Sequence, residues 1–138
     1  MTLAEWIEKY NKKNPEDKYD PNPGYQLLFR EDKGFCEVRI EENMILLGQL
    51  AGDGRFFKER AEEAARKLGL KEGGTYCIRK EIMAYIRLFG YRVEHTEEVA
   101  GGLKRYFCKH KSTGKWGIAS PAFRYETGEY AYFITWEI

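Results

Sequence analysis

Apolar side chains recur at helical spacing in three stretches of the chain. The first stretch begins at Thr2-Leu3-Ala4-Glu5, where Thr2 and Glu5 have the spacing of a capping box, in which each side chain bonds the other residue's backbone amide. Asn14-Pro15 ends this stretch, because proline lacks the amide hydrogen that a helix interior needs. The pattern predicts helices over 2–13, 55–68 and 80–89.

Shorter runs alternate apolar and polar positions, or are apolar throughout, as β-strands do. Met44–Leu50 is continuously apolar, which is typical of a strand covered on both faces. Residues 14–24 hold three prolines among charges and are expected to form an irregular connection. Strands are expected over 25–30, 35–40, 44–50, 74–78, 91–95, 103–109 and 130–137.

The order of these elements predicts an α+β (mixed α/β) fold. Because strand 74–78 stands alone between two helices, a crossover should make it a parallel neighbour of strand 44–50. Short turns elsewhere favour antiparallel pairing, so we expect a mixed, mostly antiparallel central sheet with helices on both faces. We expect a single domain over 1–138, made of an N-terminal helix and loop, a core and a C-terminal β-hairpin extension, over 1–24, 25–110 and 111–138.

Composition and charge exclude several classes of protein. The 138 residues are 43% hydrophobic and 15% aromatic, which excludes a wholly disordered chain. A net charge of +1 argues against a dedicated nucleic-acid binder, and no apolar run approaches membrane-spanning length. The acidic N-terminus lacks the pattern of a signal peptide, so a cytoplasmic location is expected. Cys36, Cys77 and Cys108 are expected to be free thiols, and no metal-ligand spacing is present.

One segment carries candidate chemistry, the six residues Gln49–Gly54 between a buried strand and a helix. A strand, a glycine turn and a helix start form a geometry that binds anions, because the first helical turn offers unpaired amides and the helix dipole adds positive charge. Phosphate and pyrophosphate are the usual ligands of such a site. The alternative is that Asp53-Gly54 is only a turn followed by a helix N-cap.

Gln49-x-x-Gly52-x-Gly54 resembles the Gln/Arg-x-x-Gly-x-Gly/Ala signature of the GCN5-related N-acetyltransferase (GNAT) superfamily. Further along, Gly90-Tyr91 is similar to the Gly-Phe pair that ends a later helix in this family. The similarity covers roughly residues 25–110. Small divergent proteins of this kind are similar to ones carried by phages and prophages.

The resemblance implies an N-acyltransferase that binds acetyl-CoA, or CoA, and transfers an acetyl group to an amine. The acceptor, a small molecule or a protein amine, is not specified by the sequence. By the resemblance, the thioester side of the site would be lined by Leu47, Gly48, Gln49 and Leu50. The pyrophosphate amides would come from Gly52, Asp53, Gly54 and Arg55. Asp53 departs from the family pattern by placing a carboxylate near a pyrophosphate.

The catalytic groups are less clear from the resemblance. Where the family often has a general-acid Tyr and an Asn, this sequence has Ile86 and Arg79. Tyr85 and Glu37 are the catalytic candidates that remain, although Glu37 also fits a solvated strand residue. Cys77 could be a nucleophile, but no base is spaced along the sequence to activate it. The alternative is an inert, buried thiol.

The alternative function belongs to a different class of protein: a catalytically inactive module with the GNAT fold that acts in binding or assembly. The missing Tyr and Asn favour it, and the Gln-x-x-Gly-x-Gly motif favours the enzyme. Aromatic residues after residue 115 either complete the core or form an interface, which would allow a homodimer through the C-terminal strands. Basic residues over 105–115 interleave with aromatics as in nucleic-acid binders, but an exposed edge hairpin explains them better.

Overall fold

The computed structural model describes residues 1–138, except for the side chains of Ile78 and Arg79. The chain divides into two compact units, residues 1–70 and 71–138, and each is described separately. The first unit contains α1 (Leu3–Lys13), β1 (Gln26–Arg30), β2 (Gly34–Glu41), β3 (Met44–Gly52) and α2 (Gly54–Leu68). The helices and strands expected for this part of the chain are thus confirmed, whereas one domain over 1–138 stays a prediction.

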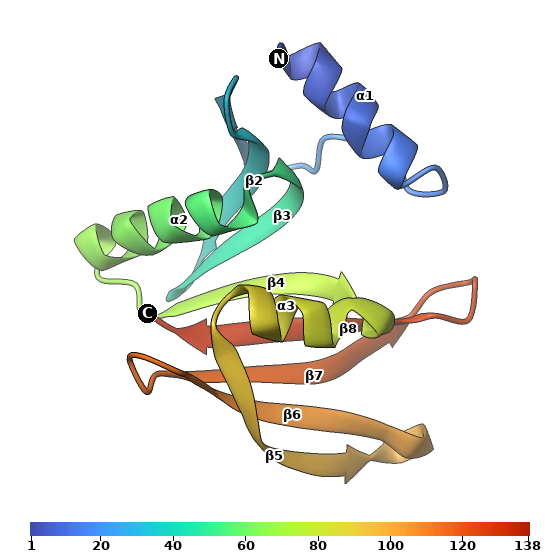
Figure 1. Cartoon of the computed structure of the whole chain (residues 1–138), viewed down its shortest axis with the longest axis vertical. Helices are drawn as coiled ribbons and strands as arrows, with labels where there is room; N and C mark the ends of the chain where they lie inside the picture. Colours follow the sequence, from blue (N-terminus) through green and yellow to red (C-terminus); the bar gives the residue numbers. More distant parts are fainter. The chain divides into compact units, whose positions relative to one another are not determined.

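The three strands of the first unit form an antiparallel meander (Figure 1). β1 pairs with β2 from Gln26↔Val38 to Arg30↔Gly34, and β2 pairs with β3 from Gly34↔Gly52 to Glu41↔Met44. β3 is two residues longer than expected, because Ala51 and Gly52 still pair with β2. A β-bulge between Cys36 and Val38 interrupts the β2–β3 register, and it brings the Glu37 side chain into the site described below.

Helix α1 covers one face of this meander. The predicted capping box is present: the Glu5 amide donates to Thr2 Oγ1 at 3.2 Å, and the Thr2 amide donates to Glu5 Oε1 at 2.9 Å. Trp6 packs in a cluster with Phe35 and Ala51, which are paired residues on β2 and β3. The Trp6 indole also donates to the Glu31 carbonyl at 3.0 Å, which ties α1 to the β1–β2 turn.

Two glycines let β2 and β3 approach closely at their paired ends. Gly34 has φ +113°, and a Cβ there would lie 1.9 Å from the Ala51 carbonyl oxygen. Gly52 has φ +99°, and a Cβ there would lie 2.0 Å from the Lys33 carbonyl oxygen. Side chains are excluded from both positions by contact and by backbone conformation. The close approach places the β1–β2 turn directly beside the start of α2.

The second unit contains α3 (Ile82–Leu88), two short 3₁₀ turns, η1 (Arg79–Glu81) and η2 (Ala100–Gly102), and a sheet. The strands of that sheet are β4 (Glu72–Ile78), β5 (Tyr91–Val99), β6 (Leu103–His110), β7 (Trp116–Arg124) and β8 (Tyr130–Glu137). Their order is β4-β8-β7-β6-β5, and the neighbouring pairs are antiparallel. The expected mixed α/β, mostly antiparallel architecture is therefore confirmed in the described chain.

The C-terminal hairpin is present as β7 and β8, but it is not peripheral in the second unit. β8 pairs with β4 from Glu72↔Glu137 to Ile78↔Ala131 and with β7 on its other side. The expected core ended at residue 110 and left β8 out. In the structure β8 lies inside the sheet, between β4 and β7. We expected an addition beyond the core because the hairpin comes last in the sequence, whereas β5 occupies the edge of this sheet.

The aromatic residues of the hairpin divide between core and surface. Tyr132 and Trp136 are 0% and 3% exposed, and the Tyr132 hydroxyl donates to the Lys104 carbonyl at 2.8 Å. Phe123 and Tyr125 are 48% and 38% exposed, and their rings contact each other. The first alternative, completion of the core, thus holds for Tyr132 and Trp136, whereas an interface formed by the exposed rings stays a prediction.

Removing residues 116–138 should prevent the second unit from folding, because β4 would lose its partner β8 and the core would lose Tyr132 and Trp136. We expect a chain truncated at residue 115 to aggregate, measured by size-exclusion chromatography and thermal unfolding. In the full chain, Tyr132→Ala should cost about 3–5 kcal/mol. Phe123→Ala, at an exposed ring, is the control. A soluble truncated chain with an unchanged melting temperature would contradict the central place of β8.

Candidate functional site

The candidate anion site lies at the N-terminal end of α2. Asp53 is the N-cap residue, and its carboxylate accepts a hydrogen bond from the Phe56 amide at 3.0 Å. The Asp53 amide itself donates to the Lys33 carbonyl at 2.8 Å. The hydrogen bond from Phe56, supported by the nearby Lys33 ammonium, lowers the pKa of Asp53 below its usual value. Asp53 is thus the N-cap of α2, as the alternative expected, and its carboxylate occupies part of this helix terminus; that this turn does no more than cap the helix stays a prediction.

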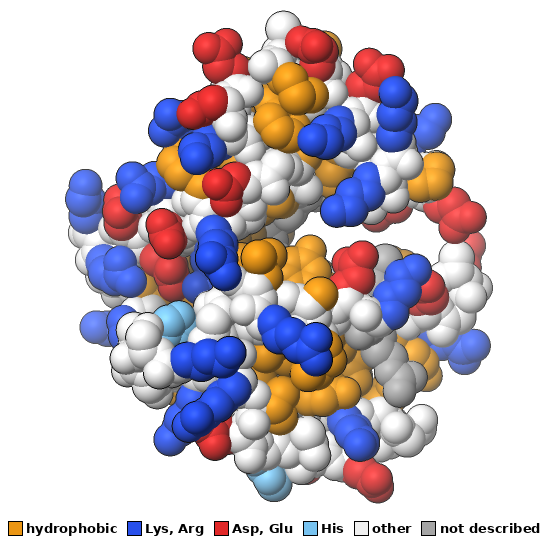
Figure 2. All heavy atoms as spheres, in the orientation of Figure 1, with side chains coloured by type: hydrophobic (Ala, Val, Ile, Leu, Met, Phe, Trp, Pro, Cys, Tyr) orange, Lys and Arg blue, Asp and Glu red, His pale blue; other side chains and the backbone are white. Residues whose placement is uncertain are grey.

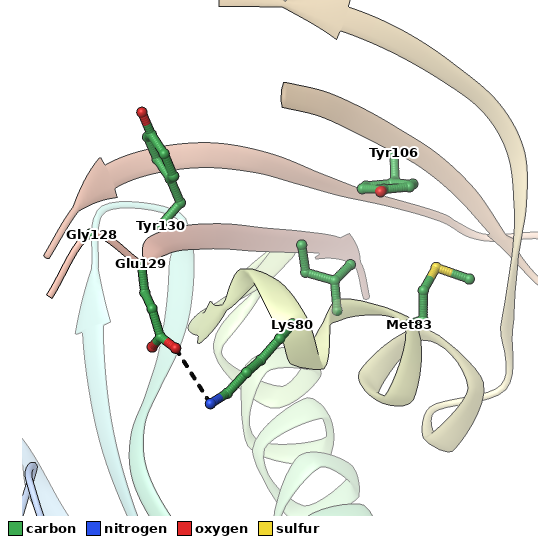
Figure 3. A pocket seen from close by; sticks show the side chains of 7 residues that line it. Lys80, Met83, Tyr106, Gly128, Glu129 and Tyr130 are labelled. Carbon is green, nitrogen blue, oxygen red and sulfur yellow. Dashed lines mark ion pairs between the residues drawn. The ribbon is translucent and has the colours of Figure 1, made fainter. Parts of the chain in front are cut away.

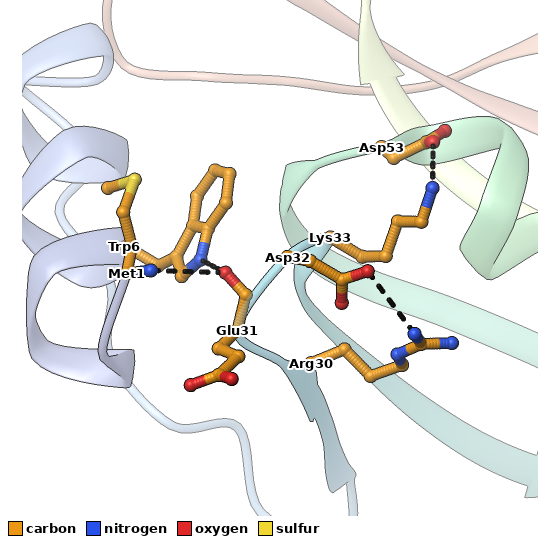
Figure 4. Close-up of polar contacts among 7 residues, drawn as sticks. All are labelled: Met1, Trp6, Arg30, Glu31, Asp32, Lys33 and Asp53. Carbon is orange, nitrogen blue, oxygen red and sulfur yellow. Dashed lines mark hydrogen bonds and ion pairs between the residues drawn. The ribbon is translucent and has the colours of Figure 1, made fainter.

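Basic side chains surround this helix terminus. Lys33 Nζ lies 3.6 Å from Asp53 Oδ2 (Figure 4). The Phe56 ring is approached by three cations, at 5.0, 5.4 and 5.5 Å from its centroid, which belong to Arg30, Lys33 and Arg60. Arg30 also pairs with Asp32 at 3.2 Å. Arg60 pairs with Glu63 at 2.8 Å. The positive side chains therefore gather at the Phe56 ring, close to the positive end of the helix dipole.

Gln49 and Glu37 form a hydrogen-bonded network that holds the connection between α1 and β1. Gln49 Nε2 donates to the Asp20 carbonyl and, at 2.9 Å, to Glu37 Oε1. Gln49 Oε1 accepts from the Asp20 amide at 3.1 Å. The Asn22 amide and side chain donate to the two oxygens of Glu37 at 3.1 and 2.9 Å. The Gln49 side chain, which the resemblance placed beside a ligand, here binds Asp20 and Glu37.

Glu37 is 2% exposed, so the alternative of a solvated strand residue is wrong. The β-bulge turns its side chain inward, and the hydrogen bonds from Asn22 and Gln49 replace the water that a buried carboxylate would lose. Its charge helps burial to raise the pKa of Tyr19 above its usual value. A general base must reach the proton that it abstracts, and Glu37 is enclosed by its own donors.

The residues expected beside the thioester all lie on β3. Gly48 faces a crowded position, because a Cβ there would lie 3.1 Å from Glu37 Oε1 and 3.2 Å from Tyr25 Cε2. Leu47 pairs with Val38 and Leu50 pairs with Cys36. The side of β3 toward which a Gly48 side chain would point is therefore filled by protein atoms, so a ligand beside Gly48 would have to approach from another side.

Tyr85 is the other catalytic candidate, and it lies on α3 in the second unit. Burial, together with the nearby Glu81, raises the pKa of Tyr85 to about 12, so its phenol stays protonated at neutral pH. Its ring contacts Phe89 at a centroid distance of 5.8 Å. Ile86, at the position of the family's frequent Tyr, is buried, and the side chain of Arg79 lies outside the described residues. The catalytic roles of Tyr85 and Glu37 stay predictions.

The three cysteines are buried and are not joined in disulfides. Burial is the main cause that raises the pKa values of Cys36 and Cys77 to about 12 and that of Cys108 to about 11. A nucleophilic cysteine needs the thiolate form, which such values suppress. The inert reading of Cys77 fits this environment better than a nucleophile.

The basic hairpin of β6 and β7 is organised by its own contacts. His110 Nδ1 accepts hydrogen bonds from the Ser112 and Thr113 amides at 3.3 and 3.2 Å, which shapes the turn. Over the face shown in Figure 2, Lys and Arg side chains are interspersed with Asp and Glu. Within the described residues, no three His, Cys, Asp or Glu side chains are grouped to hold a metal ion. No described helix has the length and apolarity needed to cross a membrane.

Several residues of this site were not found from the sequence. Arg30 and Lys33 precede the motif by about twenty residues, and the Gly34↔Gly52 pairing brings them beside Asp53. The only sequence signal was the charged turn Arg30–Lys33 before a glycine. Asn22 lies in the connection that was expected to be irregular, and no local pattern links it to Glu37.

Comparison with known proteins gives a likeness in structure alone. No protein-family model matches the sequence, and no curated protein matches it significantly. The crystal structure of the ribosomal-protein-S18-alanine N-acetyltransferase from Escherichia coli is similar over 100% of this chain and 90% of its own, with a TM-score of 0.51 and 10% identity. The crystal structure of nourseothricin acetyltransferase is similar over 88% of this chain and 69% of its own, with a TM-score of 0.48 and 15% identity.

The chain therefore has the fold of the GNAT acetyltransferases. At this level of identity the likeness defines the architecture and leaves the activity open, since one fold hosts many functions. The chemistry must be argued from the residues at the start of α2.

Glu37→Gln should destabilise the protein by about 1–3 kcal/mol, because a glutamine would direct an amide donor at Asn22 or Gln49, which are donors themselves. Urea unfolding measures the loss. The matched control is Glu41→Gln on the same strand, where the pair with Arg39 is exposed and should contribute less than about 0.5 kcal/mol. Equal effects of the two substitutions would contradict the anchoring role of Glu37.

The cysteines should react slowly with a thiol reagent in the folded protein at pH 8 and rapidly in denaturant. Because folding raises each thiol pKa above its ordinary value of 9.0, their contribution to stability is complete below pH 9 and is lost as pH rises toward 11 or 12. Unfolding measured between pH 8 and 10.5 should show stability falling above pH 9. Fast labelling of any cysteine in the native protein would contradict the burial described here.

Proposed function

We propose that this protein is an acetyltransferase that binds acetyl-CoA, or CoA, at the N-terminal end of α2 and acetylates an amine. The observation that carries the proposal is the group of cations, Arg30, Lys33 and Arg60, around the ring of Phe56 in the first turn of α2. They coincide with the Gln49–Gly54 motif that resembles the family signature, in a chain of the same fold.

The residues at this terminus fit a pyrophosphate in two respects. Phosphate oxygens are usual partners of the amides in the first turn of a helix, and here a phosphate would take the place of the Asp53 carboxylate on the Phe56 amide. Lys33 lies within 3.6 Å of the Asp53 carboxylate and is available to exchange that partner for a phosphate, because an exposed ion pair contributes little. In this proposal Gly54 and Arg55 supply backbone amides and Lys33 adds charge, whereas the Asp53 amide is bonded to the Lys33 carbonyl and Gly52 lies against the same carbonyl.

When bound, acetyl-CoA would supply an activated acyl group, as a thioester. The chain's part would be chiefly to bind and orient: the α2 terminus and Lys33 hold phosphate, and residues Leu47–Leu50 of β3 lie beside the acyl arm. The acceptor nitrogen would form a bond to the acyl carbon as the bond to sulfur breaks, and the proton that the nitrogen gives up to water would be taken up by the departing thiolate. Tyr85, protonated at neutral pH, stays a catalytic candidate of the second unit. The acceptor can be a small molecule or a protein.

The second candidate is a GNAT-fold module that binds or assembles without acetyl transfer, and a phage-type origin would suit such a small protein. Asp53 favours it, since its carboxylate occupies the Phe56 amide that an enzyme of this fold would offer to phosphate. The exposed rings of Phe123, Tyr125 and Tyr76 give this module a surface for a homodimer. Measurement of CoA binding distinguishes the two candidates.

Replacing Asp53 with Asn should tighten CoA binding. Asn caps a helix as well as Asp does, so α2 stays intact, while the negative charge near phosphate is removed and Lys33 loses its competing partner. We expect calorimetry at low salt to show an affinity about three- to tenfold higher, and the gain should shrink as salt screens the charges. Lys33→Gln should weaken CoA binding, because it removes a positive charge near the phosphate.

Gly54→Val should abolish CoA binding, because a β-branched side chain at the first helical position blocks close approach to the backbone. The matched control is Ala64→Val, which places the same side chain on an exposed position of α2. If the unmodified protein does not bind CoA even at millimolar concentration, the acetyltransferase proposal is wrong and the inactive binding module is the candidate that remains. Binding that survives Gly54→Val would contradict the assignment to the α2 terminus.

A further inference from the structure

The second unit contains a pocket that the acyl-transfer proposal does not use. It has a volume of about 330 Å³, within the range of small-molecule sites. Its lining comes from separate parts of this unit, namely η1, α3, β6, β8 and the turn between β7 and β8. The lining residues are Lys80, Ile82, Met83, Tyr106, Gly128, Glu129 and Tyr130.

The pocket combines apolar and aromatic walls with one ion pair. Ile82 is 2% exposed and belongs to the core, whereas Met83 is 40% exposed and offers a flexible thioether. Tyr106 and Tyr130 add two aromatic rings. Figure 3 shows Lys80 and Glu129 pointing toward each other, with Met83 and Tyr106 on the other side of the pocket.

The two charges of this ion pair are not equally fixed. Lys80 Nζ lies 3.4 Å from Glu129 Oε1, and the side chains are 68% and 43% exposed. The backbone of Glu129 is held at both of its polar groups: its carbonyl accepts from the Tyr125 amide at 2.8 Å, and its amide donates to Thr127 Oγ1 at 3.5 Å. The Glu129 backbone is therefore anchored in the turn, and its less exposed side chain is the better placed charge, whereas the long, more exposed Lys80 side chain is the exchangeable partner.

A carboxylate beside tyrosine rings selects for positive charge. Aromatic faces attract cations, and Tyr130 already has the Arg124 guanidinium 5.9 Å from its ring centroid. We propose that this pocket binds a small organic cation, a primary ammonium group on an apolar or aromatic body. The ammonium replaces Lys80 as the partner of Glu129, and the body lies against Met83, Ile82 and Tyr106. This site stands independently of acetyl transfer.

The probe for this proposal is 2-phenylethylamine, which is an ammonium ion at pH 7, compared with neutral 2-phenylethanol and anionic phenylacetate. The reporter is the methyl resonance of Met83 in the full chain labelled at its methionine methyl groups. Met1 and Met44 lie in the first unit and serve as internal controls. We expect the amine to shift the Met83 signal at millimolar concentration, with the alcohol weaker and phenylacetate weakest.

Two substitutions at the ion pair should act with opposite signs. Glu129→Gln should weaken binding of the amine about fivefold and leave the alcohol unchanged, whereas Lys80→Gln should strengthen binding of the amine by removing its competitor. Glu126→Gln, at an exposed position of the same turn, is the matched control and should change neither. Because none of these measurements uses CoA, they succeed or fail independently of the acyl-transfer proposal.

Several results would overturn the proposal. No shift of Met83 by 2-phenylethylamine at about 10 mM, where even weak small-ligand binding is measurable, would remove the site. Tighter binding of phenylacetate than of the amine would make Lys80 the selecting charge. Equal effects of Glu129→Gln and Glu126→Gln on the amine would show that Glu129 does not contact the ligand.

Discussion

The close approach of β2 and β3 at Gly34 and Gly52 is the constraint on which the candidate site depends. Both glycines have positive φ, and a Cβ on either would overlap a carbonyl oxygen of the other strand. The approach fixes the Lys33 carbonyl as acceptor for the Asp53 amide at 2.8 Å. It thereby sets where α2 begins and which cations lie beside its first turn.

This constraint changes the meaning of a sequence motif. In the resemblance to the GNAT signature, Gly52 permits a ligand to approach the backbone, but here another strand already approaches it. Gln49, the first motif residue, binds Asp20 and Glu37 with its side chain. The motif residues Gln49 and Gly52 are therefore engaged within the protein, and an anion at the start of α2 would have to displace the Asp53 carboxylate from the Phe56 amide.

The two units carry different kinds of binding chemistry. In the first unit, cations lie around the Phe56 ring at the positive end of α2, and the Asp53 carboxylate partly neutralises their charge. In the second, a carboxylate and two tyrosines line a pocket. An anion such as a phosphate suits the first arrangement, and an organic cation suits the second. The charge offered to a ligand, positive at Lys33 and negative at Glu129, decides between these ligand classes.

The sequence by itself determined the elements and the class of fold. Helical spacing, the capping box at Thr2 and Glu5 and the strand runs act within a few residues, so local patterns predicted them. The tertiary structure decided which distant residues meet: Lys33 beside Asp53, Asn22 beside Glu37 and β8 beside β4. From the sequence alone, a strand carboxylate such as Glu37 is expected to be exposed to solvent. In the structure it is buried at a β-bulge, where donors from another segment bind it. Strand order and burial arise from contacts across the chain, which local spacing does not encode.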